Sequence, residues 1–321
     1  MKKTLGRLSL GLAAALLLAG GGGNVLAADY PSKAITAVVP FGAGGGTDRW
    51  ARVMSSVGFD VFGTGMRVQN RGGASGTVGW KYMLDQGADG HTVLMGSPTP
   101  VIAALLEKQP PFDPTKVKIV AYYSIMKPTL IAPKDKPFSS WDGLVTYLKE
   151  GGKKLTLGGT ITQTLGIASL LGQLDLADRV VLVPYSGTGK AVNDFLGGHI
   201  DLAAVTTSTA VSLADKSVSL VNATDLDYPE NAMGVLGNVP NAKKLGLKPF
   251  NPPRFIAVHP DTPDEQVAIL SEKFGEMLKS KPVDRLIGKL GEVIIFVPHD
   301  EAKDAYQDVL AEAKKYLPMF Q

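Results

Sequence analysis

The sequence of 321 residues contains no cysteine. Without cysteine the protein cannot form a disulfide, a thiolate metal site or a cysteine nucleophile, and it cannot be anchored in a membrane through a lipidated cysteine. A chain of this length without disulfides has to be stabilised by a hydrophobic core, and it is long enough to form roughly two domains.

Histidines and catalytic motifs are also scarce. No pair of histidines has metal-ligand spacing such as H-x-x-x-H, and there is no G-x-S-x-G nucleophile elbow. The four histidines are His91, His199, His259 and His299. Asp194 and Asp201 could be an acid and a base, but we interpret them as solvated helix-end residues. We therefore expect no metal site and no enzyme, and an exported enzyme stays an open alternative.

Two glycine-rich segments come near to nucleotide-binding motifs, and both are incomplete. Residues 187–190 (GTGK) lack the leading spacing of a P-loop, and Thr47 stands where a dinucleotide fingerprint starting at Gly42 has its third glycine. We expect no cofactor, and a dinucleotide site is the weaker alternative.

Long apolar runs are absent after the first 28 residues. Within these, Lys2, Lys3 and Arg7 precede an apolar run at residues 8–19, and residues 25–27 (VLA) fit a cleavage site. This layout predicts a signal peptide over residues 1–28 and a periplasmic location. The alternative is an N-terminal membrane anchor, but the run is shorter than the roughly 20 residues that a bilayer requires.

The predicted mature chain carries no net charge. The whole sequence has 33 lysines and arginines against 30 aspartates and glutamates. The predicted signal peptide accounts for this excess, because it holds three basic residues and no acidic one. A neutral surface argues against nucleic acid or an anionic membrane as a partner, since both require a basic patch.

Short apolar strands alternate with helical segments along the mature chain. The first strand is expected at residues 35–41, and Trp50, Met54 and Val57 recur at helical spacing behind it. Thr47 is the expected N-cap of this helix. Further strands are expected at residues 66–70, 91–95, 118–125, 129–132, 155–158, 180–183, 200–205, 218–221, 255–258 and 293–297. This alternation predicts parallel sheets with helices on both faces, where ligands bind at the carboxyl ends of the strands.

Five connections share one design, in which a strand ends in glycine, serine or threonine and a helix follows at once. They cover residues 42–48, 72–77, 96–99, 158–164 and 185–189. Such loops expose backbone N–H groups at the positive end of a helix, glycine lets a ligand approach closely, and hydroxyls add donors. The set is suited to an anion and needs no lysine or arginine. For each loop taken alone, the alternative is an ordinary tight turn.

Several segments resemble the Bug (TctC-like) binding proteins of tripartite tricarboxylate transporters, and the resemblance covers nearly the whole mature chain. The segments are residues 30–33 (YPSK), 39–48 (VPFGAGGGTD), 70–76 (NRGGASG), 89–97 (DGHTVLMGS), 184–187 (PYSG) and 195–201 (FLGGHID). The resemblance implies two Rossmann-like α/β domains joined by two crossover strands, a periplasmic-binding-protein (type II) architecture with the ligand cleft between domains. The implied domains are residues 29–128 plus 254–321 and residues 129–253.

The resemblance further implies that a ligand carboxylate contacts the first loop and the loop after residue 158. The other loops add hydroxyls by their position, and a strand end adds Thr207 and Ser208 by topology. The predicted ligand-binding residues are Phe41, Gly44, Gly45, Gly46, Thr47, Ser75, Ser97, Thr99, Gly159, Thr160, Thr162, Gln163, Tyr185, Thr207 and Ser208. Asp48 is assigned to capping and loop geometry, because its charge would repel a carboxylate.

The sequence departs from the family pattern at two places. Residues 159–165 (GTITQTL) lack the second glycine and the histidine of the family loop, and the segment at Phe255 lacks the family's tryptophan. These differences indicate a ligand other than the family's commonest ones.

The resemblance implies a periplasmic solute-binding protein that captures a small organic carboxylate and delivers it to a permease of one large and one small subunit. A dicarboxylate is expected, because two facing sets of loops can each bind one end. Presentation of the bound ligand to a membrane sensor kinase is an alternative that the sequence leaves open. No long apolar patch indicates an obligate interface, so we expect a monomer.

Overall fold

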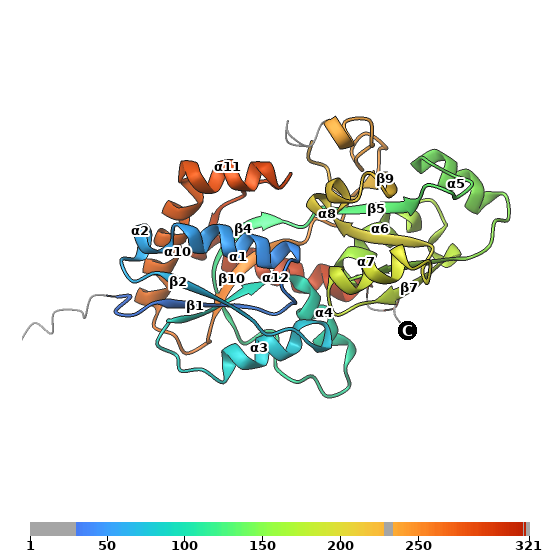
Figure 1. The fold of residues 1–321 in the computed structure, drawn as a ribbon. Helices are drawn as coiled ribbons and strands as arrows, with labels where there is room; N and C mark the ends of the chain where they lie inside the picture. Colours follow the sequence, from blue (N-terminus) through green and yellow to red (C-terminus); the bar gives the residue numbers. More distant parts are fainter. Residues whose placement is uncertain (1–29, 228–233, 317, 319–321) are drawn as a thin grey trace, which may run out of the picture.

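The computed structural model describes residues 30–227, 234–316 and 318, and it shows two β-sheets side by side, each covered by helices (Figure 1). This arrangement confirms the predicted two-part α/β fold class. The predicted signal peptide lies outside the described residues. Within them, no helix is both long and apolar enough to cross a membrane.

The first sheet has six strands in the order β11-β4-β10-β3-β1-β2. Its strands are β1 (Ile35–Val39), β2 (Met66–Asn70), β3 (Thr92–Gly96), β4 (Lys118–Ile125), β10 (Pro253–Val258) and β11 (Val297–Pro298). The helices of this first half are α1 (Gly46–Ser56), α2 (Gly58–Phe62), α3 (Thr77–Leu84), α4 (Pro98–Leu106), α10 (Asp264–Lys279), α11 (Lys281–Lys289) and α12 (His299–Tyr316), with the short turn η1 (Ala74–Gly76).

The second sheet has five strands in the order β7-β6-β8-β5-β9. They are β5 (Pro128–Pro133), β6 (Leu155–Gly159), β7 (Val180–Pro184), β8 (Leu202–Thr206) and β9 (Ser217–Asn222). The helices of this second half are α5 (Trp141–Lys149), α6 (Ile161–Gly172), α7 (Thr188–Leu196) and α8 (Thr207–Ser212), with the turn η2 (Ala177–Arg179) before β7.

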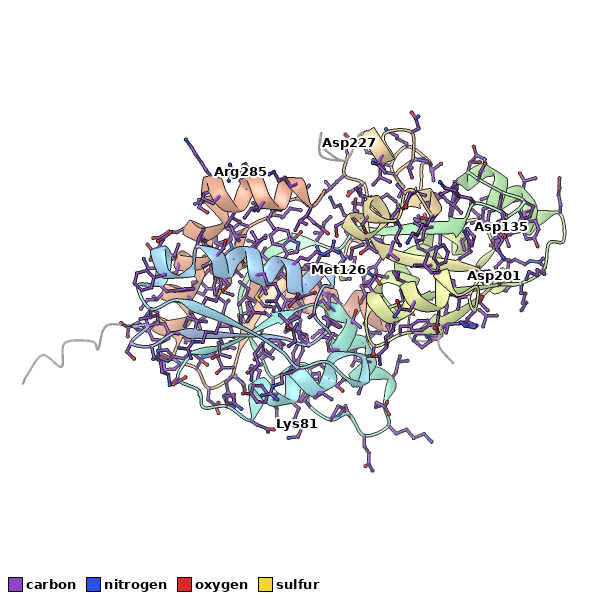
Figure 2. All side chains as sticks on the ribbon, in the orientation of Figure 1. Lys81, Met126, Asp135, Asp201, Asp227 and Arg285 are labelled. Atoms are coloured by element: carbon purple, nitrogen blue, oxygen red, sulfur yellow. The ribbon has the colours of Figure 1, made fainter. Side chains whose placement is uncertain are left out.

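The chain passes between the sheets twice. It leaves β4 and enters β5 through Met126 and Lys127, and it returns to the first sheet at β10. The domain boundaries expected from the sequence stay a proposal, which these two changes of sheet support. Figure 2 labels Met126 between the two halves, so this passage lies at their junction.

Both sheets are mixed, so the prediction of parallel sheets was only partly right. β1 is parallel to β2 and β3, and β6 is parallel to β7 and β8. β10 instead runs antiparallel to β3 and β4, and β5 runs antiparallel to β8 and β9. A parallel neighbour requires a crossover helix over the sheet face, whereas a strand that arrives from the other half has no such constraint.

Hydrophobic side chains cover both faces of the first sheet. Along β1, Ile35, Ala37 and Val39 pack with α1, α2, α10 and α11, and Val38 points to the opposite face with α3, α4 and α12, as alternation along a strand requires. On that opposite face the ring of Trp80 stacks on Phe112 with centroids 4.7 Å apart. The first half therefore has its own core, and a separate buried cluster that includes Leu130, Leu157 and Leu202 forms the core of the second half.

One small apolar cluster joins the two halves. Ile102 of α4 packs against Ile161 and Leu165 of α6, and all three side chains are buried. Beside them the hydroxyls of Thr99 and Thr162 lie 2.7 Å apart, also fully buried. Helices α4 and α6 thus fix the halves against each other along one side.

A partly buried carboxylate organises the outer end of the second half. Asp201 accepts hydrogen bonds from Lys136 (2.8 Å) and from the backbone N–H and hydroxyl of Thr156 (both 3.0 Å), and Lys153 Nζ lies 3.2 Å away. Burial acts to raise the pKa of Asp201, but these bonds outweigh it and hold the pKa well below its ordinary value. Asp201 is therefore part of the scaffold.

Three local predictions were wrong. The sequence predicts a loop over residues 159–163 and a helix over 164–173, but α6 begins at Ile161, because Thr160 and Gln163 form a capping arrangement at its start. Helix α8 was missed, since its residues (TSTAVS) are poor helix formers, and it begins where the Thr206 hydroxyl accepts a bond from Thr209 N–H. The last expected strand shortens to the two residues of β11.

Candidate ligand-binding cleft

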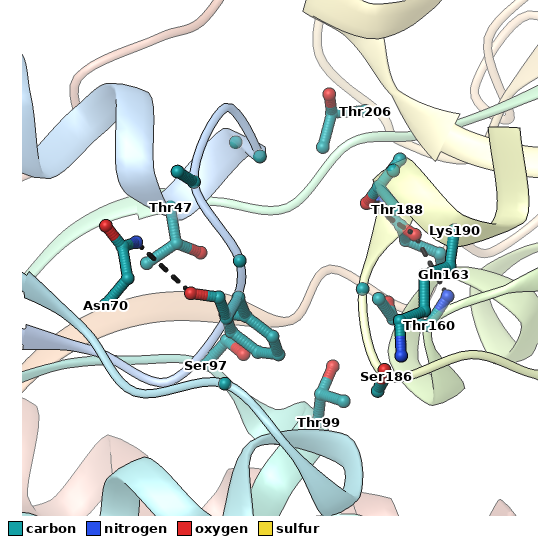
Figure 3. A pocket seen from close by; sticks show the side chains of 18 of the residues that line it. Thr47, Asn70, Ser97, Thr99, Thr160, Gln163, Ser186, Thr188, Lys190 and Thr206 are labelled. Carbon is teal, nitrogen blue, oxygen red and sulfur yellow. Dashed lines mark hydrogen bonds between the residues drawn. The ribbon is translucent and has the colours of Figure 1, made fainter. Parts of the chain in front are cut away.

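A cleft of about 650 Å³ lies between the two halves and is lined by residues from both (Figure 3). The first half contributes Phe41, Gly42, Ala43, Gly45, Gly46, Thr47, Asn70, Gly72, Gly73, Ser97, Thr99 and Arg254, and Met126 lies at the junction. The second half contributes Thr160, Gln163, Ser186, Gly187, Thr188, Gly189, Lys190, Asn193 and Thr206. Among the described residues that line it, none is acidic.

The N-terminus of α1 opens into the cleft from the first half. The N-cap is Gly45, whose carbonyl accepts the first bond of the helix from Arg49 N–H, so the expected cap at Thr47 was placed two residues late. The N–H groups of the first turn have no acceptor within the helix. The three glycines before the helix leave these donors uncovered, which favours an anion at this end of the cleft.

The side chain of Asp48 points away from the cleft and supports the loop from behind. It accepts hydrogen bonds from Gly44 N–H (2.8 Å), Asn70 Nδ2 (2.9 Å) and Arg52 Nε (2.9 Å), and its side chain is 2 % exposed. Burial acts to raise the pKa of Asp48, and these bonds lower it below its ordinary value. Asn70 Nδ2 also donates to Phe41 O at 3.1 Å, the bond drawn in Figure 3. Arg52 of α1 thus neutralises the carboxylate, which in turn holds the loop through Gly44 N–H.

Two helix N-termini face the cleft from the second half. Thr160 is the N-cap of α6, and its N–H donates to Gln163 Oε1 at 3.1 Å. Gln163 Nε2 donates to the hydroxyl of Thr188, the first residue of α7, at 3.1 Å. The amide of Gln163 therefore ties the starts of α6 and α7 together, so that both present their first turns to the same space.

Two hydroxyls in the cleft are buried without a hydrogen-bond partner among the described residues. They are Ser97 Oγ, at the end of β3, and Thr160 Oγ1, on the opposite wall. Ser97 is 1 % exposed and Thr160 is 5 % exposed. A buried polar group without a partner costs about 1–3 kcal/mol, so each gains a favourable interaction when a ligand supplies an acceptor.

Eight of the residues predicted from the sequence line the cleft, and seven do not. Those lining it are Phe41, Gly45, Gly46, Thr47, Ser97, Thr99, Thr160 and Gln163. Those outside its lining are Gly44, Ser75, Gly159, Thr162, Tyr185, Thr207 and Ser208.

Six of the seven have hydrogen-bond contacts elsewhere, and the seventh, Ser75, lies in a short turn. Thr162 bonds Thr99, and the Thr207 hydroxyl donates to Lys127 O at 3.2 Å. Tyr185 donates to Asp194 at 2.6 Å, which together with burial raises its pKa to about 12. Gly44 bonds Asp48, Gly159 O accepts from Tyr185 N–H, Ser75 lies in η1, and Ser208 Oγ lies 3.0 Å from Thr206 Oγ1.

Sequence reasoning missed Thr188, Lys190, Thr206 and Arg254 as cleft residues. Thr188 belongs to the connection at residues 185–189 and Lys190 follows it in the first turn of α7, so their position at a helix start was a usable signal. Thr206 could have been found as the last residue of a strand. Arg254 had no signal, because it follows two prolines in a loop-like segment and reaches the cleft through the change of sheet.

In the described part of the chain, no group of three or more histidines and carboxylates could hold a metal ion. The chemistry of the cleft is that of backbone amides, hydroxyls and two cations.

The fold and the cleft define a solute-binding protein of the periplasmic-binding-protein class. Residues 51–308 match the model of the family described as the tripartite tricarboxylate transporter family receptor (TctC), and the chain belongs to this family. Its members are periplasmic binding proteins and not enzymes.

Similar proteins are known in bacteria. Protein BugT of Bordetella pertussis is 29% identical over 302 residues, which cover 88% of each chain. MatC of Rhodopseudomonas palustris, solved with bound malate, has a TM-score of 0.74 at 24% identity and covers 91% of this chain and 100% of its own. An R. palustris protein solved with adipate has a TM-score of 0.76 at 22% identity and covers 88% and 98%. The two structures show that the fold is shared.

Proposed function

We propose that the protein binds a small organic dicarboxylate between its two halves, in the periplasm, and delivers it to the two-subunit permease of a tripartite tricarboxylate transporter. The observation that carries the proposal is the convergence of three helix N-termini, of α1, α6 and α7, on one cleft without an acidic lining residue. Malate in MatC and adipate in the second R. palustris protein support a carboxylate ligand of similar size in this protein.

A dicarboxylate suits the distribution of donors in the cleft. The α1 loop and Ser97 offer donors on one wall, and Thr160 with the first turn of α7 offers them on the other (Figure 3). One carboxylate at each wall would hold the halves together, as closure of two domains around a ligand does in binding proteins. The closed form is then the surface that a permease recognises.

The expected affinity is adequate for capture from dilute solution. A hydrogen bond to a charged group contributes about 1.5–3 kcal/mol, so four or five such bonds contribute roughly 6–15 kcal/mol. Loss of translational and rotational freedom subtracts several kcal/mol. Micromolar binding requires about 8 kcal/mol, which lies within reach of this donor set.

The test is thermal unfolding of the mature protein, refolded from denaturant to strip any bound ligand, against acetate, succinate, malate, adipate and citrate. A ligand at 100 times its dissociation constant adds about 2.7 kcal/mol of stability. We expect a rise in midpoint of about 5 °C or more with a dicarboxylate. Stabilisation by acetate alone would overturn the dicarboxylate preference, and stabilisation by no carboxylate would overturn the binding function.

A substitution at Ser97 separates binding from stability. Ser97→Ala removes a buried hydroxyl that has no partner, so we expect the unliganded protein to be as stable as wild type or slightly more stable. The dissociation constant for the best dicarboxylate should rise roughly tenfold or more. Ser212→Ala is the matched control, because Ser212 is exposed on α8 and bonds only its own helix. Equal affinities of both variants would remove Ser97 from the site.

Delivery to the permease is tested by uptake. Cells that lack this protein should lose accumulation of the stabilising carboxylate, and the wild-type chain should restore it. Unchanged uptake in the deletion strain would contradict a transport role.

A further inference from the structure

Arg254 is a buried cation at the floor of the cleft. It is the second residue of β10, directly after the chain returns to the first sheet, and it is 1 % exposed although it lines the cleft. Its Nη2 atom lies beside the N-terminus of α1, since a Cβ built on Gly46 would be 3.2 Å from it. The guanidinium and the uncovered amides of α1 therefore face the same part of the cleft.

The hydrogen bonds of the guanidinium leave one side of it unused. Nη1 donates to Ile125 O at 3.2 Å and to Glu292 Oε2 at 3.0 Å. Nε is buried without a partner, and within the described residues Nη2 donates no hydrogen bond. An arginine at neutral pH has five N–H donors and cannot lose its charge. Of the donors without a partner among the described residues, Nη2 is the one that lies beside the N-terminus of α1.

The charges around Arg254 do not balance. Lys127 is 2 % exposed, and its side chain donates to a neutral carbonyl, Gly291 O, at 3.0 Å. Glu292, which is 3 % exposed, is the acidic partner of Arg254. Burial lowers the pKa of Lys127, Glu292 acts in the opposite direction, and Arg254 lowers the pKa further. Two buried basic groups thus share one carboxylate, an arrangement that an additional anion would stabilise.

We propose that Arg254 binds the ligand carboxylate directly through Nη2, beside the first-turn amides of α1, and thereby makes a negative charge obligatory at this end of the cleft. The inference rests on the proposed function and adds a specificity-determining residue to it. Glu292 is then a positioning residue, because its bond to Nη1 turns Nη2 toward the cleft. A neutral amide or ester at this position of the ligand would leave the guanidinium buried without a counter-ion.

The rival explanation is that Arg254 and Glu292 only join the segments at the change of sheet. Removing one of the pair would leave a buried charge unpaired and could prevent folding. The decisive variant is therefore the double substitution Arg254→Met with Glu292→Met, which removes both charges and keeps apolar volume. Arg285→Met on the exposed face of α11 is the matched control, and Figure 2 shows Arg285 at the surface.

The experiment measures dissociation constants by isothermal titration calorimetry with malate, adipate and citrate, and with adipamate, the monoamide of adipate. For the acid that binds wild type best, we expect the double variant to lose roughly 10- to 100-fold in affinity and the control to lose none. Wild type should prefer adipate to adipamate, and the double variant should lose much of that preference. Glu292→Gln should retain the preference if it folds, because the guanidinium remains.

Two results overturn the inference in different ways. A folded double variant that binds the acid within twofold of wild type would show that Arg254 is structural, and the proposed function would stand. Wild type that binds none of the three acids would overturn the proposed function and this inference together. If the double variant does not fold, Arg254→Lys is measured in its place, because lysine keeps the positive charge on a shorter side chain. It should weaken binding at least several-fold, and unchanged binding would again make Arg254 structural.

Discussion

The hydroxyl pair of Thr99 and Thr162 provides a direct test of how the two halves meet. Their Oγ1 atoms lie 2.7 Å apart, both residues are fully buried, and they belong to α4 and α6 of opposite halves. Replacement of threonine by valine keeps the shape and removes the hydroxyl. Because the bond spans the halves, its energy reports whether this arrangement persists in solution.

The expected loss in the free energy of unfolding depends on which hydroxyl loses its hydrogen-bond partner. Thr99→Val loses the bond and leaves the Thr162 hydroxyl buried alone, which costs about 1–3 kcal/mol, and Thr162→Val should cost about the same. The double variant leaves no hydroxyl unpaired, so its loss should be below about 1 kcal/mol. A coupling energy of about 1–3 kcal/mol between the two substitutions follows.

The assay is denaturant unfolding of wild type, both single variants and the double variant, each without ligand. Thermal midpoints should follow the same order, with a shift of about 2–4 °C for each kcal/mol. If the single losses add up to the double loss within about 0.5 kcal/mol, the hydroxyls do not bond in solution. The halves would then be further apart in the unliganded protein than in this structure.

Three further predictions concern the scaffold. Asp201→Asn should cost about 2 kcal/mol at pH 7, because a bond to a charged group is lost. The pKa of Asp201 is lower in the folded protein than in the unfolded chain, where it is near 4. The stability that Asp201 contributes is therefore complete above about pH 4 and is lost as the pH falls through the folded pKa. Unfolding curves of the variant and of wild type should converge below pH 4. Gly79→Ala should destabilise by about 1–3 kcal/mol, because its Cβ would lie 2.7 Å from Pro40 Cα and from Arg71 O, whereas Gly87→Ala, with open space, should not; equal midpoints would contradict the packing of α3. Asp48→Ala should release the first loop and weaken carboxylate binding, measured by calorimetry, although it removes a negative charge near the ligand; tighter binding would show that charge outweighs loop geometry.

The proposed anion site combines fixed charges with the dipoles of oriented backbone amides. On the α1 wall the first-turn amides and Arg254 act together, and on the facing wall α6 and α7 present amides and hydroxyls, with Lys190 at the exposed rim. Amide donors on rigid helices need little reorganisation when a ligand binds, and they discriminate by position as well as by charge. Such a site is compatible with several carboxylates of similar length, and Arg254 sets the requirement for charge at one end.

Much of the local structure is determined by residues that are neighbours in the sequence. The glycine-rich loop before α1, the apolar strand β1 and the position of Asp48 at the start of α1 follow from spacing of a few residues, and sequence reasoning reached them. It also reached Ser97 and Thr160, because hydroxyls at strand ends next to helix starts face the carboxyl edge of a sheet.

The tertiary structure alone decided which of these groups meet. Thr162 shares a hydrogen bond with Thr99, which lies 63 positions away in the sequence, and Tyr185 donates to Asp194. Two donors that were expected to bind the ligand are therefore already paired within the protein. Arg254 reaches the floor of the cleft because β10 returns antiparallel from the other half and Glu292 holds its guanidinium. Spacing along the chain determines the face of a strand or helix, but pairing across the two halves depends on how separate cores pack, and no local pattern encodes that.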